Sequence, residues 1–360
     1  MKMKRNIITT LLAGLFAICS WADSDFGPRY WTADGQEHPL TMEGIAFTIP
    51  DEAVAVDLRM PAGEGEQARF CTLNITKANP NRLYYLNTWG YHPEELDGAN
   101  IVDNGEAGDI CLIDGYDFFC PIPFTAASVS YLLSLSDENS HEGADGNTVY
   151  SETLMLPFAA SHALNYDTNV ELTLADFQVN TYTGECYGSQ LQFQSTASWP
   201  LTPNSPYLLD NLPTGRVMFY SEQVKVPTSQ STETLYAPYR FKGTTTRQTL
   251  STDDFVWHPA NGCFVRCEQE TQIAPFRAYI SNTNEMPTAA EELTVSVEDD
   301  QIIIEPTSVS ADAVWHSTAE SPTNVYAVDG RLVSTGTKRS ATNGLRKGIY
   351  IIGRRKIVVK

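Results

Sequence analysis

Short runs of apolar residues, separated by Gly, Pro, Asn and Asp, follow one another along most of the chain. Within many runs apolar and polar residues alternate, and VAVDLRM places Val54, Val56 and Leu58 on one face with Asp57 on the other. A period of two residues is typical of a strand with one buried face. No window keeps the 3.6-residue period of an amphipathic helix over three turns. The pattern therefore predicts an all-β protein.

Polar segments divide the predicted strands into three series. The segment that begins at Ser136 is rich in acidic residues and Gly, and residues 286–292 have the composition of a linker. The 360 residues are also more than one hydrophobic core usually serves. We therefore expect two β-sandwich-like domains, at residues 23–135 and 148–285. A small C-terminal Ig-like β-sandwich is expected at residues 293–360.

The N-terminus has the pattern of a secretory signal peptide. Lys2, Lys4 and Arg5 precede an uncharged, mostly apolar run, and small residues stand at the two positions that a signal peptidase reads before the bond after Ala22. A membrane span needs about 20 apolar residues, and this run has fewer. We expect residues 1–22 to be removed and the mature protein to be secreted or held at the outer cell surface, without a transmembrane segment.

Charge is unevenly distributed. The formal net charge is −20, yet the last thirty residues contain nine Lys or Arg and no acid, so all 44 acidic residues precede them. Between Arg82 and Arg216 there is no Lys or Arg. Phosphate backbones bind through Lys and Arg, so nucleic acid is not expected as a partner of the acidic body. Acidity also favours the solubility of an exported protein.

Cysteine usage agrees with export. Six cysteines remain after removal of the signal peptide, and an even number in an exported chain favours disulfides, although six allow 15 pairings. Cys263 and Cys267 lie too far apart along a strand to bond to each other. Their spacing, without a second such pair, does not indicate zinc. We therefore expect disulfides, no bound metal and no cofactor. The six are Cys71, Cys111, Cys120, Cys186, Cys263 and Cys267.

Three short motifs follow one another near the C-terminus. The segment VYAVDGRLV has a tight-turn signal at Asp329-Gly330, LRKGIYII is apolar at successive positions, and RKIVVK ends the chain on a cationic strand. Positive charge on an edge strand discourages unwanted pairing. The residues that carry the motifs are Asp329, Gly330, Arg331, Gly348, Tyr350, Lys356, Val358 and Lys360.

In order and spacing, these motifs resemble the type A C-terminal sorting domain of cargo proteins of the type IX secretion system of Gram-negative bacteria. The connection between the last two strands, around Gly353, is shorter than is usual in that family. The resemblance covers about a fifth of the chain and implies that the C-terminal domain contacts the export machinery. Segments of the body, such as NPNRLYYLN and APFRAYI, are similar to surface proteins that carry the same tail, some of them adhesin-like and without a settled activity.

The sequence contains no catalytic motif that would assign an activity. The six His residues form no H-E-x-x-H motif, and neither G-x-S-x-G nor a Gly-rich phosphate loop occurs. We therefore expect no catalysis and favour a binding, adhesin-like or structural protein. The alternative is a secreted glycoside hydrolase, which needs two facing carboxylates, or a carbohydrate-binding accessory module.

Two segments could bind a ligand. Aromatic side chains combine an apolar face with a polar tip, and those of the RLYYLNTWGYH and WHPANG segments could stack on sugar rings. Core packing is the competing interpretation. The oxygen-rich segment Asp137–Asn147 could hold calcium or could be a solvated acidic loop, and its spacing does not match an EF-hand. The candidate partners are a glycan or a surface protein. The aromatic residues are Tyr84, Tyr85, Trp89, Tyr91 and Trp257.

Overall fold

A computed structural model gives the structure of the chain and confirms the all-β class. The signal segment 1–22 lies outside the described residues. The structure divides into two compact units, residues 1–297 and 298–360. The described residues are 28–43, 46–59, 72–87, 94–142, 148–195, 199–229, 239–282, 290–298, 323–327, 332–336, 348–352 and 355–359.

The first sheet of the larger unit has ten strands. Most neighbours are antiparallel, but β10 runs parallel to β9 and antiparallel to β18. A hairpin at Asn104-Gly105, both with positive φ, joins β8 to β9, as expected for this residue pair. In spatial order the strands are β14 (Val170–Leu172), β13 (His162–Asn165), β18 (Arg216–Val226), β10 (Phe124–Ser134), β9 (Glu106–Ile113), β8 (Asn100–Asp103), β7 (Leu83–Leu86), β5 (Ala55–Asp57), β1 (Arg29–Trp31) and β2 (Glu37–Pro39).

The second sheet also has ten strands and takes most of them from the later part of the body. In spatial order they are β11 (Ser140–Glu142), β12 (Thr148–Met155), β17 (Pro206–Leu212), β15 (Gln178–Tyr187), β16 (Gln190–Ser195), β25 (Glu292–Glu298), β22 (Cys263–Arg266), β21 (Phe255–His258), β24 (Arg277–Asn282) and β19 (Tyr239–Thr244). The sheet curls, because β24 and β19 at one end contact β12 and β17 near the other.

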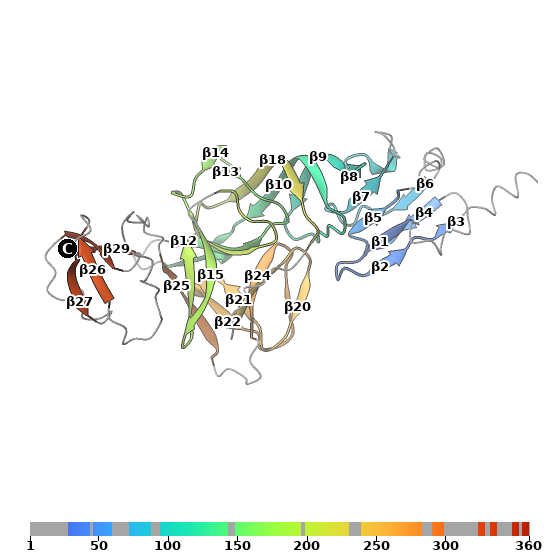
Figure 1. Ribbon diagram of the computed structural model, residues 1–360. Coiled ribbons are helices and arrows are strands. Elements are labelled where there is room, and N and C mark those ends of the chain that lie inside the picture. Colours follow the sequence, from blue (N-terminus) through green and yellow to red (C-terminus); the bar gives the residue numbers. More distant parts are fainter. Residues whose placement is uncertain are drawn as a thin grey trace, which may run out of the picture. The chain divides into compact units, whose positions relative to one another are not determined.

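The two large sheets pack face to face as a sandwich. Figure 1 shows β13, β18, β10 and β9 on one side of the unit and β12, β15, β21 and β22 on the other. The core between them includes Leu83, Tyr131, Leu209 and Phe219, all buried. The expected separate domains 23–135 and 148–285 are thus replaced by one unit. The reason is non-local pairing: β10 from the first half is hydrogen-bonded to β18 from the second half along ten residue pairs.

A second core fills the inside of the curled sheet. There the ring of Phe241 packs against the rings of Phe193 and Phe264, with centroids 5.3 Å and 5.9 Å apart, respectively. Leu293 of β25 is fully buried in the same core, and β25 pairs with β22. The strand at 293–297 therefore belongs to the body, so the expected boundary at the 286–292 linker moves to the end of this strand.

Smaller elements complete the larger unit. A three-stranded sheet packs on the first sheet around Phe47, Tyr84 and Leu86. No helix within the described residues has the length and apolar character of a membrane span. The remaining elements are β3 (Met42–Glu43), β4 (Ala46–Ile49), β6 (Thr72–Ile75), the pair β20 (Gln248–Leu250) and β23 (Thr271–Ile273), and the 3-10 helices η3 (Glu94–Leu96), η4 (Asp137–Asn139) and η5 (Pro259–Asn261).

The smaller unit contains one antiparallel sheet of four strands. Their spatial order is β27 (Leu332–Gly336), β26 (Thr323–Ala327), β28 (Gly348–Ile352) and β29 (Arg355–Val359). β28 pairs on both sides, with β26 and with β29, whereas β29 pairs only with β28 among the described strands. The chain therefore ends on an edge strand, as the cationic terminal motif predicts.

The five described cysteines are free thiols, which differs from the expected disulfides. They lie in separate places: Cys111 is exposed on β9, whereas Cys120 is buried beside the hydroxyl of Tyr85, 3.6 Å from its Sγ. Burial raises the pKa of the Cys120 thiol to about 12. Cys71 lies outside the described residues. The others are Cys186, Cys263 and Cys267.

Candidate functional site

The first sheet has one buried face and one open face across five adjacent strands, β14, β13, β18, β10 and β9. Alternate residues of these strands, such as Val129, Tyr131 and Phe219, are buried in the sandwich core. The residues between them are exposed or half-buried. We call the twelve central members of this set, which lie between the pair Ser134–Arg216 at one end and the pair Thr125–Lys225 at the other, the outer face. It consists of Glu171, His162, Leu164, Met218, Tyr220, Glu222, Ser128, Ser130, Leu132, Asp109, Cys111 and Ile113.

An apolar row crosses the outer face at right angles to the strands. Leu164 of β13 stands opposite Met218 of β18, Met218 opposite Leu132 of β10, and Leu132 opposite Ile113 of β9. Cross-strand neighbours on one face of a sheet are in side-chain contact range. Ile113 ends the row with 42% of its surface exposed. These four side chains form a continuous apolar strip that the described residues leave partly open to solvent.

The neighbouring row changes from large rings to small side chains. His162 stands opposite Tyr220, and their rings are stacked with centroids 5.1 Å apart and an interplanar angle of 20°. On the other side of Tyr220 come Ser130 and then Cys111. Between neighbouring strands, the side chains in this row therefore change from the large ring of Tyr220 to the small side chain of Ser130. We call this place the Tyr220 step.

Two carboxylates, Glu171 and Glu222, lie near Tyr220. Glu171 Oε1 lies 2.8 Å from Nδ1 of His162. Partial burial and then the charges of Glu171 and Glu222 raise the pKa of the Tyr220 hydroxyl. In the third row Ser128 stands between Glu222 and Asp109, and its hydroxyl donates a hydrogen bond of 2.7 Å to Asp109 Oδ1. The step thus offers hydroxyl and carboxylate oxygens beside an aromatic ring.

A salt-bridged clasp closes one end of the outer face. The Arg216 guanidinium lies 4.5 Å from the centre of the Tyr166 ring and binds Asp167 Oδ1 through Nε at 2.8 Å and Nη2 at 2.6 Å. These hydrogen bonds lower the pKa of Asp167. Gly215 precedes the clasp with a φ of +94°, and a Cβ there would lie 2.5 Å from Asp167 Oδ2. The charge of Arg216 is therefore already neutralised.

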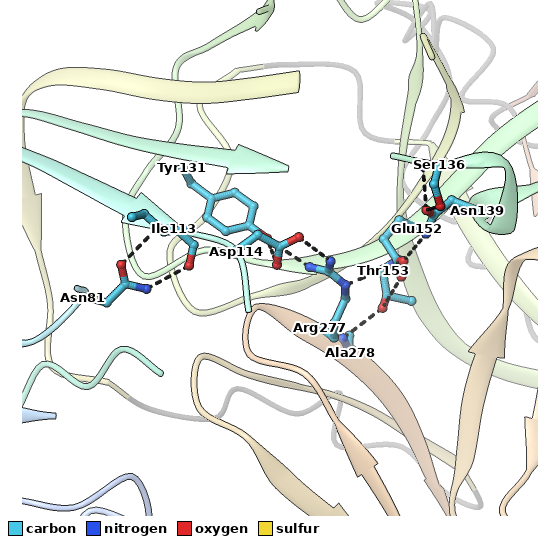
Figure 2. Close-up of polar contacts among 10 residues, drawn as sticks. All are labelled: Asn81, Ile113, Asp114, Tyr131, Ser136, Asn139, Glu152, Thr153, Arg277 and Ala278. Carbon is cyan, nitrogen blue, oxygen red and sulfur yellow. Dashed lines mark hydrogen bonds and ion pairs between the residues drawn. The ribbon is translucent and has the colours of Figure 1, made fainter. Parts of the chain in front are cut away.

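A buried polar network supports the outer face from behind. Tyr131 points into the sandwich from β10, between the outer residues Ser130 and Leu132. Its hydroxyl donates a hydrogen bond of 2.8 Å to Asp114 Oδ1 and accepts one of 3.0 Å from Arg277 Nη1, as Figure 2 shows. Arg277 Nη2 also donates to Asp114 Oδ2 at 2.8 Å. The three groups connect both large sheets.

Glu152 continues this network into the second sheet. Its Oε2 lies 3.6 Å from Arg277 Nε and accepts a hydrogen bond of 2.9 Å from Asn139 Nδ2. Its Oε1 accepts the backbone N–H of Thr153 at 2.8 Å (Figure 2). Burial raises the pKa of Glu152, and Arg277 only partly opposes it. Burial by itself would lower the pKa of Arg277. The interactions with Tyr131, Glu152 and Asp114 raise it by more than burial lowers it, so the pKa of Arg277 lies well above its ordinary value.

Asn81 holds the end of β9 in position. Its Nδ2 donates to the carbonyl oxygen of Ile113 and its Oδ1 accepts the N–H of Ile113, both at 2.9 Å (Figure 2). The same Nδ2 donates to the carbonyl oxygen of Tyr116 at 2.9 Å. Asn81 is fully buried. The outermost residue of the apolar row is therefore fixed by hydrogen bonds on its own backbone. An outer face with a rigid backbone can bind a ligand without first ordering itself.

The structure does not bring the predicted aromatic residues together into an exposed platform. Tyr84 and Tyr85 are both buried, on opposite faces of β7, so neither ring is available to a ligand. Trp257 is half-buried and packs edge-to-face on Phe264 at 5.1 Å. Trp89 and Tyr91 lie outside the described residues. For the described members of this set, core packing is the interpretation that the structure supports.

The sorting-like residues fall partly within the described strands. Gly348 and Tyr350 lie on β28, opposite Val359 and Ile357, while Lys356 and Val358 lie on β29. The other members lie outside the described residues. They are Asp329, Gly330, Arg331 and Lys360.

The acidic segment contributes to the buried network through one residue. Asp137 and Glu138 are exposed in η4, whereas Asn139 turns its amide toward Glu152. Residues 143–147 lie outside the described part. Among the described residues, no group of three or more His, Cys, Asp or Glu side chains is arranged to hold a metal ion.

The outer face is absent from the predictions because its members come from strands far apart in the sequence. His162 and Tyr220 are 58 positions apart and meet only through the pairing of β13 with β18. A local signal exists in β10, where Ser128, Ser130 and Leu132 alternate with buried residues.

Comparison with protein-family models, with curated proteins and with solved structures finds no match to this chain.

Proposed function

We propose that this chain is a secreted or cell-surface binding protein of adhesin-like type, without catalysis, that presents its outer face to a partner. The observation that carries the proposal is the open face of five adjacent strands, where an apolar row and an aromatic ring stand beside carboxylates and hydroxyls. Scattered single apolar residues are normal on a surface, whereas an apolar strip with a polar rim is typical of an interaction site.

Rigidity of the scaffold supports the same proposal. The buried network of Tyr131, Asp114, Arg277 and Glu152 ties the strands of the outer face to the second sheet. Its charged groups are engaged with one another, and their side chains are only 11 to 18% exposed, so an external substrate would meet little of them. A buried network that is satisfied in this way makes one arrangement of the strands more stable than its alternatives.

The C-terminal unit is proposed to act as an address for export. Its motifs resemble a type IX sorting domain, and the four-stranded sheet with an edge strand at the end is compatible with that role. Together with the signal peptide, it would bring the acidic body to the cell surface. The body would then be the part that meets the partner.

Binding by variants of the outer face tests the proposal. The mature protein would be applied to whole cells and to a combined glycan and protein array. We expect Met218→Glu to abolish the binding that the wild type shows, because a charge would interrupt the apolar row. Tyr187→Ala is the matched control, since Tyr187 is 65% exposed but lies on β15 of the other sheet. Equal binding by wild type and Met218→Glu, with both folded, would contradict the proposal.

A further inference from the structure

We infer that the Tyr220 step binds one ring of a neutral saccharide. This inference rests on the proposed function and names the ligand class of the same face. A sugar ring has an apolar face of C–H groups and a rim of hydroxyls. A site for it therefore needs an aromatic or aliphatic wall with hydrogen-bonding oxygens at its edge.

The aromatic wall comes from the free face of Tyr220. Its ring is nearly parallel to that of His162, which covers the side toward β13. The opposite ring face is therefore turned toward β10, where the neighbouring residues are Ser130 and then Cys111. Strands lie about 4.8 Å apart, so these two small side chains keep the surface low over about 10 Å beside the ring.

The two sides of this low surface differ in chemistry. Leu132 and Ile113 of the apolar row border it on one side. Ser128, Asp109 and Glu222 border it on the other. A ring seated on Ser130 would meet aliphatic carbon on one edge and carboxylate or hydroxyl oxygens on the other. Ionised carboxylates accept hydrogen bonds from hydroxyls and form stronger bonds than neutral acceptors do.

Charge selects neutral over acidic saccharides. The twelve residues of the outer face include three carboxylates, Glu171, Glu222 and Asp109, and neither Lys nor Arg. The exposed cations of β18, Arg216 and Lys225, stand beyond its two ends. The nearest guanidinium, Arg216, is held by Asp167 in two hydrogen bonds. A carboxylate or sulfate on a sugar would therefore be repelled, because like charges destabilise each other.

The same composition disfavours a protein partner at the step. Cores of protein–protein interfaces are depleted in charged residues, particularly Asp and Glu. Here the carboxylates of Glu171 and Glu222 are close enough to Tyr220 to raise the pKa of its hydroxyl. A protein that covered this ring would have to desolvate both carboxylates. A saccharide seated on Ser130 can satisfy Glu222 with its own hydroxyls, while Glu171 is already paired with His162 on the other side of the ring.

The test uses the mature protein and four variants. Tyr220→Ala removes the aromatic wall, and Ser130→Leu fills the step while leaving the ring of Tyr220 in place. Ser134→Leu is the matched control, because it makes the same change on the same strand, where Ser134 stands opposite Arg216. Tyr187→Ala controls for the loss of an exposed tyrosine. Thermal melts check that each variant folds.

The probes are neutral oligosaccharides of glucose, mannose, xylose and N-acetylglucosamine, with sialylated and uronic-acid oligosaccharides as the acidic set. We expect at least one neutral probe to bind in calorimetry. Tyr220→Ala and Ser130→Leu should each weaken it tenfold or more, while both controls bind as the wild type does. Acidic probes should not bind.

Four outcomes would overturn the inference. Binding of a neutral probe that Ser130→Leu leaves unchanged would place the sugar elsewhere, and preference for acidic probes would contradict the charge argument. If no saccharide binds but a protein on the array does so through Met218, the ligand class is wrong and the proposed function stands. If no array or cell binding depends on the outer face, both fail.

Discussion

Arg277 is the residue on which the buried network converges. It donates to Tyr131 and to Asp114 and lies 3.6 Å from a carboxylate oxygen of Glu152. The backbone just before it is unusual, because Phe276 is fully buried with a φ of +62°. A non-glycine residue in this region is uncommon and is held there by its surroundings. The N–H of Met155 donates to the Phe276 carbonyl, which helps to hold this conformation.

Removal of Arg277 should therefore destabilise the protein strongly. Arg277→Met leaves Asp114 and Glu152 inside the sandwich without their cation, and breaking a buried pair costs about 3 to 5 kcal/mol. Chemical denaturation would measure the loss. Arg216→Met is the control, because its partner Asp167 is largely exposed, and an exposed pair contributes about 0 to 1 kcal/mol. Similar losses for the two variants would contradict the assignment of a buried network.

Glu152 should give the stability a pH dependence of definite sign. Its pKa is raised in the folded state above the ordinary value of 4.5, so the folded protein binds a proton more tightly than the unfolded chain. The contribution of Glu152 to the free energy of unfolding is therefore fully present below pH 4.5. It is lost as the pH rises through the folded-state pKa of Glu152. Glu152→Gln should remove this part of the slope in melts taken across that range.

Asp210 should change stability with pH in the same direction, because burial raises its pKa as well. The difference between wild type and Glu152→Gln therefore isolates Glu152, and Asp210→Asn serves as the comparison. Parallel pH profiles for wild type and Glu152→Gln would show that Glu152 does not change its proton affinity on folding.

Gly243 is required by close packing against Met155. A Cβ at this position would lie 2.5, 2.7 and 2.9 Å from the Sδ, Cβ and Cγ atoms of Met155. We expect Gly243→Ala to cost about 1 to 3 kcal/mol, because overpacking forces neighbours to shift. Gly108→Ala, where nothing lies within 4 Å, should change stability by less than about 0.5 kcal/mol.

The Met155→Ala background tests the cause of the Gly243 effect. If the clash is responsible, Gly243→Ala should cost less there than in the wild type, and urea denaturation of the four proteins gives the coupling. Equal costs in both backgrounds would point to the backbone of Gly243 instead.

At the scale of elements, β25 decides where the body ends. Its pairing with β22 and the complete burial of Leu293 place it in the second core, although its sequence follows a polar segment. Neighbouring strands on the other side, such as β16, come from the middle of the chain. This strand from the end of the body therefore lies between β16 and β22 and joins them in one curled sheet.

Loss of β25 should weaken the body itself. Leu293→Ala should cost about 3 kcal/mol, as is usual for a buried Leu, whereas the exposed Thr294→Ala should be nearly neutral. A fragment of residues 23–297 should melt as the full-length body does, and one of residues 23–291 at a lower temperature. Identical melts for the two fragments would return β25 to the tail.

At the scale of the whole molecule, the division after Val297 separates the proposed binding body from the proposed address. Deletion of residues 348–360 removes β28 and β29, and β28 is an inner strand of the four-stranded sheet. We expect the body to keep its thermal transition while the protein remains in the periplasm. Cell fractionation and calorimetry of the truncated protein measure both. Normal surface display after the deletion would reject the sorting role.

The sequence predicted the class of the fold and several local features correctly. Alternation at Val54, Val56 and Leu58 indicated a strand, and β5 lies there, although Asp57 on its expected polar face is buried as well. The terminal motifs indicated a strand at the end of the chain. These features depend on residues within one element, whose period of two is a property of the local backbone. Disulfides were predicted from a cysteine count alone, and the five described thiols are free.

Only the tertiary structure decided which strands pair and which side chains meet. The hydrogen bonds between β10 and β18 join positions about ninety residues apart, and they turned two expected domains into one sandwich. Other non-local contacts bury Tyr84 against the three-stranded sheet and Tyr85 in the sandwich core. The pairing of β13 with β18 places His162 against Tyr220 on an open face. Local alternation says that a residue faces one side of its strand. The neighbours that cover or expose that side come from distant parts of the chain, so burial and site geometry are properties of the assembled sheets.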